Sequence, residues 1–177
     1  TTNTKAYELY LKAKHTYEKR TDINDTETAR DLLRQAIELD DTLIAAKVQL
    51  AVTSIQMGNH VEAINIYTPA LEQAEKLGDM HGMGHTLNNI GNVHWYKGEY
   101  DNALEYYEKS LKIYEEIGDR NWMSVILNNI GVMLRERGNY EKSLEYCNRV
   151  LVICNELDNK GGTATALSNI GMVHLYK

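Results

Sequence analysis

The sequence predicts an all-α fold built from antiparallel pairs of helices. Composition is the first observation, since the chain has one proline, no phenylalanine and many Leu, Ala, Glu, Lys and Tyr residues. Such a composition suits long helices joined by short turns. The second observation is that short marker segments return every 40 residues. The third is that apolar residues between the markers recur at helical spacing, so each repeat is expected to be one helix pair.

Charge and hydropathy exclude two classes of partner. The 177 residues are 43% apolar and 25% charged, with a net charge of −6, which is the balance of a globular protein. An acidic chain repels phosphate, so we expect no nucleic-acid partner. No apolar run approaches the roughly 20 residues of a membrane span, and residues 1–12 lack the hydrophobic stretch of a signal peptide. We therefore expect a cytoplasmic protein with no membrane partner.

The repeat is visible in three independent series of residues. The segment LNNIG at 87–91 returns unchanged at 127–131 and as LSNIG at 167–171. The other two series keep the same interval and read Gly58-Asn59-His60, Gly98-Glu99-Tyr100 and Gly138-Asn139-Tyr140, and Gly78-Asp79, Gly118-Asp119 and Asp158-Asn159.

The glycines predict where the helices end. Glycine takes a positive φ without steric cost, so the Gly-x-Tyr segments are expected to cap the first helix of each pair and the Gly-Asp segments the second. Between these turns Ala103 and Tyr107 fall on one helical face, and Glu105 and Glu108 fall on the other. Pro69 interrupts a helical pattern and predicts a kink. We expect helices at about 3–20, 26–39, 43–57, 60–77, 82–97, 101–117, 122–137, 141–157 and 162–177.

The register predicts one repeat domain over residues 1–177. Its repeats span about 3–41, 42–79, 80–119 and 120–159, and residues 160–177 form a half repeat with one unpaired helix. The register calls for a turn glycine directly after Lys177, so we expect a fragment of a longer protein. The last helix then has no following partner for Leu167, Ile170 and His174, and we expect self-association through this apolar face.

The repeats resemble the tetratricopeptide pattern W-x2-L-G-x2-Y, followed by A-x3-F and P. The residues that match are Leu87, Ile90, Gly91, His94, Ala103 and Tyr107 in one repeat, and Leu127, Ile130, Gly131, Leu134, Ser143 and Cys147 in the next. The resemblance extends over essentially the whole chain. It implies a right-handed superhelical solenoid of about four helix pairs and one extra helix.

The 40-residue period exceeds the usual 34 by about a turn and a half of helix. In this respect the chain is similar to kinesin light chains, spindle-orientation adaptors and bacterial peptide-sensing regulators. A shorter resemblance, at residues 6–12 and 35–40, is to the repeat regions of bacterial class III nucleotide cyclases and signalling proteins. It implies that a catalytic domain such as a nucleotide cyclase can be attached to these repeats.

The tetratricopeptide resemblance implies that the first helices of the pairs line a concave groove. The register points His85, Asn88, Asn89, Asn92, Trp95 and Tyr96 inward from one repeat, Val125, Asn128, Asn129, Val132, Arg135 and Glu136 from the next, and Asn169, Met172, Leu175 and Tyr176 from the last. Of these we expect peptide contacts from Asn88, Asn89, Asn92, Trp95, Tyr96, Asn128, Asn129, Arg135 and Asn169.

The repeated asparagines allow two interpretations. Each amide offers a donor and an acceptor, so Asn89, Asn129 and Asn169 can bind the backbone of a peptide without reading its side chains. Alternatively the amides bridge neighbouring helices and satisfy buried polar groups. Some tetratricopeptide domains clamp a terminal carboxylate with Lys and Arg, but this strip has Arg135 and no lysine, so such a clamp is not expected.

Catalytic and metal chemistry have little support in the sequence. His81 and His85 stand four residues apart, a spacing that can hold a metal, but no third ligand accompanies them and incidental surface histidines are favoured. His94 and His174 replace the packing tyrosine and are expected at helix interfaces, and Cys147 is expected to be a small buried hydrophobe. No nucleophile, base and acid share a recognisable spacing, and no phosphate-binding loop is present. We expect no enzymatic activity, cofactor or metal in this chain.

These observations favour a non-catalytic protein-protein interaction scaffold that binds a peptide or partner protein in its concave groove. We expect it to belong to a larger bacterial signalling protein. The alternative is a structural spacer or self-association module. Exposed aromatics and amides gathered on the inner face would favour binding, whereas a uniformly charged inner face would favour the spacer.

Overall fold

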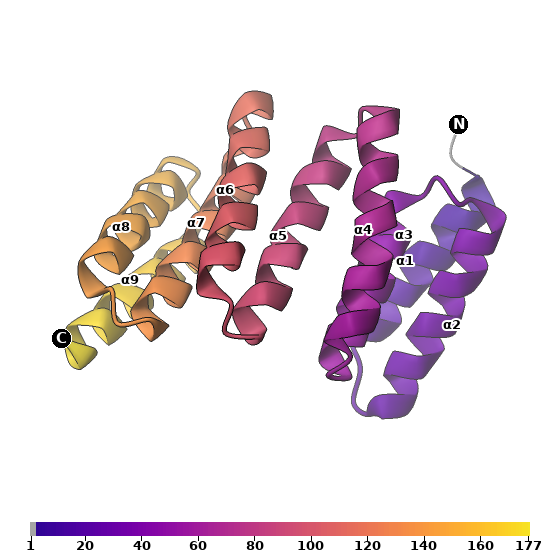
Figure 1. Cartoon of the computed structure of the whole chain (residues 1–177), viewed down its shortest axis with the longest axis horizontal. Coiled ribbons are helices and arrows are strands. Elements are labelled where there is room, and N and C mark those ends of the chain that lie inside the picture. Colours follow the sequence, from indigo (N-terminus) through magenta and orange to yellow (C-terminus); the bar gives the residue numbers. More distant parts are fainter. Residues whose placement is uncertain (1–2) are drawn as a thin grey trace. The chain divides into compact units, whose positions relative to one another are not determined.

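The computed structural model describes residues 3–177, which form nine α-helices and no strand (Figure 1). The all-α prediction is confirmed. The helices are α1 (Thr4–Glu18), α2 (Ile23–Leu39), α3 (Ile44–Gln56), α4 (His60–Leu77), α5 (Met80–Tyr96), α6 (Tyr100–Ile117), α7 (Arg120–Glu136), α8 (Tyr140–Glu156) and α9 (Lys160–Tyr176).

Several helices begin two or three residues earlier than predicted. The reason is that Asp22, Asp119 and Asn159 are N-caps, whose side chains accept hydrogen bonds from backbone N–H groups of the first turn. The prediction used the Gly-Asp segments only as helix ends. In the structure Gly118 ends α6 and Asp119 starts α7, so the pair serves both helices.

The turn between the pairs requires a left-handed residue. Gly78 and Gly118 have φ of +66° and +72°, and Asp158, at the same place in the register, has φ of +50°. Glycine meets no steric cost there, whereas an L side chain does. Asp158 therefore adopts the left-handed turn conformation of the repeat although it is not a glycine.

The chain divides into two compact units, Thr1–Asn89 and Ile90–Lys177, and the division falls within α5. In the first unit α1 packs on α2, α2 on α3, and α3 on α4, and α1 also contacts α3. Small residues such as Ala29, Ala36 and Ala46 let these helices approach closely, with Leu33 buried among them. The prediction of one domain over 1–177 stays a prediction.

A buried cation joins three helices of the first unit. Arg30 on α2 is only 4% exposed, and its Nη1 donates to Thr53 Oγ1 and Ser54 Oγ on α3, each at 2.9 Å. Its Nη2 lies 2.8 Å from Glu62 Oε1 on α4. Burial of a charge is costly unless it is paired and hydrogen-bonded, and Arg30 meets both conditions.

The second unit repeats the same arrangement. Here α7 packs on α6 and α8, α8 packs on α9, and α7 contacts α9, as expected for stacked helix pairs. Tyr107, Tyr114 and Ile130 are fully buried in its core. Tyr107 lies against Gly91, where an added Cβ would stand 2.8 Å from two ring carbons. Glycine is needed at this position because the helices are so close.

Helix α4 continues through Pro69 and ends at Leu77. The predicted segment is therefore confirmed. Thr68 Oγ1 donates to Ile64 O at 3.0 Å, one residue before the proline. Such a bond often bends a helix, and the kink at Pro69 stays a prediction.

Candidate functional site

Three side chains on α7 and α9 form a continuous row of hydrogen bonds. Arg135 Nη1 donates to Asn169 Oδ1 at 3.3 Å, and Asn169 Nδ2 donates to Asn128 Oδ1 at 2.8 Å. Asn128 and Arg135 are seven residues apart and so share one face of α7, and Asn169 reaches them from α9. We call Asn128, Asn169 and Arg135 the amide row. All three are half-buried, so the row both bridges helices and remains open to solvent.

An aromatic pair lies at the end of α5. The rings of Trp95 and Tyr96 stack with centroids 5.6 Å apart, and Trp95 Nε1 donates to Glu136 Oε2 on α7 at 2.7 Å. Trp95 is half-buried and Tyr96 is 57% exposed. The bond to Glu136 holds the indole in place while its neighbour remains accessible, which suits a binding anchor.

The other predicted asparagines have packing contacts. Asn92 Oδ1 accepts a hydrogen bond from Tyr107 at 2.7 Å, which satisfies the hydroxyl of a buried ring. Asn129 is half-buried. Asn88 and Asn89 belong to the first unit and are buried, and Asn89 Nδ2 donates to His85 O on its own helix at 2.9 Å. Contact of these four residues with a ligand stays a prediction.

A small hollow adjoins the amide row. It measures about 200 Å³ and is lined by residues of α7, α8 and α9 that include Val125, Asn128, Cys154 and Thr165. Its walls combine apolar side chains with small polar ones. A hollow of this kind can receive one aliphatic side chain beside the row.

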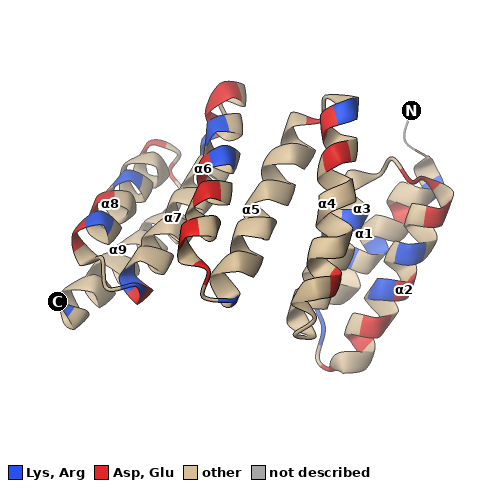
Figure 2. Cartoon of the chain, in the orientation of Figure 1, with Lys and Arg blue, Asp and Glu red and all other residues tan. Residues whose placement is uncertain are grey.

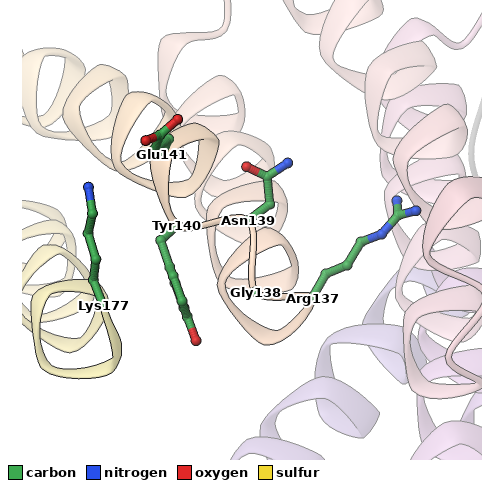
Figure 3. A pocket seen from close by; sticks show the side chains of 6 residues that line it. All are labelled: Arg137, Gly138, Asn139, Tyr140, Glu141 and Lys177. Carbon is green, nitrogen blue, oxygen red and sulfur yellow. The ribbon is translucent and has the colours of Figure 1, made fainter.

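A second hollow, of about 610 Å³, lies at the turn between α7 and α8 and next to Lys177 (Figure 3). None of the nine predicted contact residues lines it. Arg137, on its wall, makes an ion pair with Asp101 at 2.5 Å. We place the candidate site at the amide row, because it joins three of the nine predicted contact residues in one series of hydrogen bonds.

Charged residues are scarce in three of the first helices, α5, α7 and α9. No Asp, Glu, Lys or Arg occurs in α5, and α9 has only Lys160. Figure 2 shows α5 without a charged segment, whereas α6 carries several of both signs. In α7 the charged residues lie at the ends, with Arg135 and Glu136 as neighbours of opposite sign. The inner positions of these three helices are therefore almost uncharged, whereas α1 carries five charged residues.

The histidines have different environments. His94 stacks on Tyr106 with centroids 5.1 Å apart, and its Nδ1 lies 2.5 Å from Glu99 Oε2, which confirms it at a helix interface. Hydrogen bonds from Lys97 and then from His94 lower the pKa of Glu99 to about 2. His174 is exposed on α9, in line with the expectation that this face has no following helix, and its place at a helix interface stays a prediction.

The remaining side chains singled out in the sequence lie as follows. His85 is half-buried, and desolvation lowers its pKa to about 4. Within residues 3–177 no group of three or more His, Cys, Asp or Glu side chains could hold a metal ion. Cys147 is buried, as predicted, and burial raises the pKa of its thiol. A raised pKa leaves little thiolate and so little nucleophilic reactivity.

The fold is that of stacked helical-hairpin repeats, and comparison with known proteins agrees. The tetratricopeptide repeat family model matches residues 41–116 and 122–177. The chain belongs to the tetratricopeptide repeat family. Membership supports a protein-interaction scaffold. No curated protein sequence matches the chain.

Two solved structures share the fold. The chain superposes on aspartyl phosphate phosphatase F from Bacillus subtilis with a TM-score of 0.80 and 20% identity, covering 96% of this chain and 44% of that one. It superposes on BtubC (BKLC) from P. vanneervenii with a TM-score of 0.72 and 17% identity, covering 96% of this chain and 80% of that one. The chain thus spans less than half the length of the phosphatase structure. No helix within the described residues combines the length and apolar character needed to cross a bilayer.

Sequence reasoning missed how the site residues pair. Glu136 fixes Trp95, and Tyr107 fixes Asn92. Glu136 was expected to point into the groove but was not paired with Trp95, and Tyr107 was expected only as a packing residue. The 40-residue register carried a signal for the first pair, because positions 95 and 136 differ by one repeat and one residue. Adjacent first helices bring such positions side by side.

Proposed function

We propose that the chain is a non-catalytic scaffold that binds a polypeptide segment along α7 and α9, with Trp95 and Tyr96 as anchors. The observation that carries this proposal is the amide row, a half-buried series of hydrogen-bonding groups open to solvent on an almost uncharged face. Amide groups open to solvent suit the capture of a peptide backbone, and exposed aromatic side chains suit anchors.

The surroundings of the row support a peptide as the ligand. The 200 Å³ hollow beside Asn128 offers space for one side chain, while the row supplies hydrogen bonds to a main chain. A folded partner that inserts an extended loop would use the same contacts. The proposal includes the predicted setting, a cytoplasmic bacterial signalling protein with further domains.

The experiment is a screen of a random peptide display library against the chain, followed by titration calorimetry of the selected peptide. Asn128→Ala and Asn169→Ala should each weaken binding by about 1 kcal/mol, the typical net value of one hydrogen bond. Trp95→Ala should cost about 2 kcal/mol or more, as a buried aromatic anchor does.

Two controls make the result specific. Glu108 lies exposed on α6, so Glu108→Ala should leave the affinity unchanged. Circular dichroism melts of each variant separate lost binding from lost folding. Equal affinity of the wild type and all three face variants would refute the proposal and favour a spacer.

A self-association module is the second candidate, because α9 exposes large apolar side chains. Leu167 is 53% exposed and Leu175 is 75% exposed. Exposed apolar surface of this kind often marks a contact. Light scattering over a range of concentrations tests it, and Leu175→Glu should keep the chain monomeric if this face associates. A monomer at every concentration would exclude this candidate.

A further inference from the structure

The amide row has a fixed hydrogen-bond direction, and Arg135 sets it. A guanidinium group can only donate, so the atom of Asn169 that faces Arg135 must be the oxygen Oδ1. The other end of that amide, Nδ2, is then turned to Asn128 and can only donate. The atom of Asn128 that accepts this hydrogen bond must therefore be its Oδ1. One charged residue thus orients two amides in series.

The N–H groups left over after these bonds outnumber the acceptor sites that are left over. Asn128 keeps both protons of Nδ2, Asn169 keeps one, and Arg135 keeps its remaining N–H groups. Within the described part of the chain these donors make no further hydrogen bond to the protein. Each amide oxygen of the row already accepts one bond from within the chain and keeps one further lone pair, so the surface that a ligand meets offers mainly donors.

The row itself carries one positive charge, that of Arg135, and a carboxylate lies on the next residue of the chain. Glu136 follows Arg135 directly, and its carboxylate accepts from Trp95 Nε1 at 2.7 Å. A cation next to a carboxylate creates a weaker field than a lone cation, so the row gives little preference to an anion. Neutral acceptors are favoured.

Building on the proposed function, we propose that Arg135 is a specificity-determining residue that orients the row for acceptors. The ligand group that fits the row is the main-chain carbonyl oxygen of a peptide segment. Asn128 and Asn169 contact the carbonyls, and Arg135 acts mainly through them. A segment that presents main-chain N–H groups at this place would meet donors and leave groups on both sides unpaired, which is costly.

The test uses a probe with carbonyl groups and no N–H, N-acetylproline dimethylamide, and follows the side-chain amide signals of Asn128 and Asn169 by nitrogen-15 NMR. Titration of the wild-type chain should shift both signals. Arg135→Lys keeps a donor and should keep the response. Arg135→Glu supplies an acceptor, reverses both amides, and should weaken the probe at least tenfold, the effect of roughly 1.4 kcal/mol.

A second variant tests the inference even if Arg135→Glu fails to fold. Asn128→Asp has almost the same shape and still accepts from Asn169, but it lacks the outward Nδ2 donors. It should lose the probe as well. The matched control is Arg137→Glu, which makes the same charge change at an exposed residue outside the row and should leave probe binding unchanged.

The outcomes separate this inference from the proposed function. Absence of shifts in the wild type, or unchanged binding in Asn128→Asp, would overturn the inference. Acetate binding at least tenfold tighter than the neutral probe would overturn the preference for main-chain carbonyls and make the row a carboxylate site. If the probe binds but the display screen selects no peptide, only the proposed function is contradicted. The hydrogen bonds that orient the row lie within the chain itself and do not depend on a peptide ligand.

Discussion

The three glycines at 91, 131 and 171 occupy one register position in three different packing environments, and alanine at each should have a different effect. An added Cβ at Gly91 would lie 2.8 Å from two ring carbons of Tyr107 and 3.3 Å from Ala103 O. At Gly131 the nearest atom is Cys147 Sγ at 3.1 Å, and at Gly171 no atom lies within 4 Å.

The magnitudes follow from two opposing effects. Alanine in a helix interior gains about 1 kcal/mol over glycine. Overpacking costs about 1–3 kcal/mol, and the ring of Tyr107 cannot move aside because it is buried and bonded to Asn92. Gly91→Ala should therefore lose about 1 kcal/mol, Gly131→Ala should be near neutral, and Gly171→Ala should gain about 1 kcal/mol.

Urea unfolding followed by far-ultraviolet circular dichroism measures the series, with the midpoint compared at constant slope. Hydrogen exchange of the α9 amides adds a local reading for Gly171→Ala, since a terminal helix can open on its own. Gly91→Ala as stable as Gly171→Ala would refute the reasoning, because helix propensity alone would then decide both positions.

Three further changes should alter stability in directions that the contacts fix. Asp158→Gly removes an L side chain at φ +50° and should stabilise by about 1 kcal/mol in urea unfolding. Glu62→Gln removes the shorter of the two ion pairs of the buried Arg30 and leaves only Glu27, at 3.8 Å, so it should cost about 1–3 kcal/mol; a thermal melt equal to wild type would contradict it. Burial first and Lys14 second lower the pKa of His85 to about 4, below its unfolded value of about 6.5. Stability present above pH 6.5 is therefore lost as the pH falls to 4, by up to about 3 kcal/mol, and His85→Gln should flatten that slope in urea titrations.

The helices could be predicted because each repeat marks its own turns. Gly118 has to adopt a left-handed conformation, and few residue types allow this. The N-caps were missed because Asp119 was considered only as part of the preceding turn. A capping side chain belongs to the helix that follows it, so the starts of α7 and α9 were placed too late.

The site was predicted only as a set of positions. The register placed Asn128 and Asn169 on neighbouring first helices. It contains no information on whether the oxygen or the nitrogen of each amide faces its neighbour. That depends on Arg135, whose bond to Asn169 is a contact between helices. His174 shows the same limit in another way, since its expected burial depends on a neighbouring helix and not on its own helix.

The scarcity of charge on α7 and α9 affects how fast a partner can arrive. Opposite charges steer proteins together over distances of about 10 Å at moderate salt and can raise association rates to about 10⁸ M⁻¹s⁻¹ or more. A partner approaching α7 and α9 meets only Arg135 and Glu136 on the inner positions, and their long-range fields largely cancel. Encounter is then governed by diffusion and orientation, at about 10⁵–10⁶ M⁻¹s⁻¹. For such a surface, differences in affinity between partners arise from how slowly each one leaves.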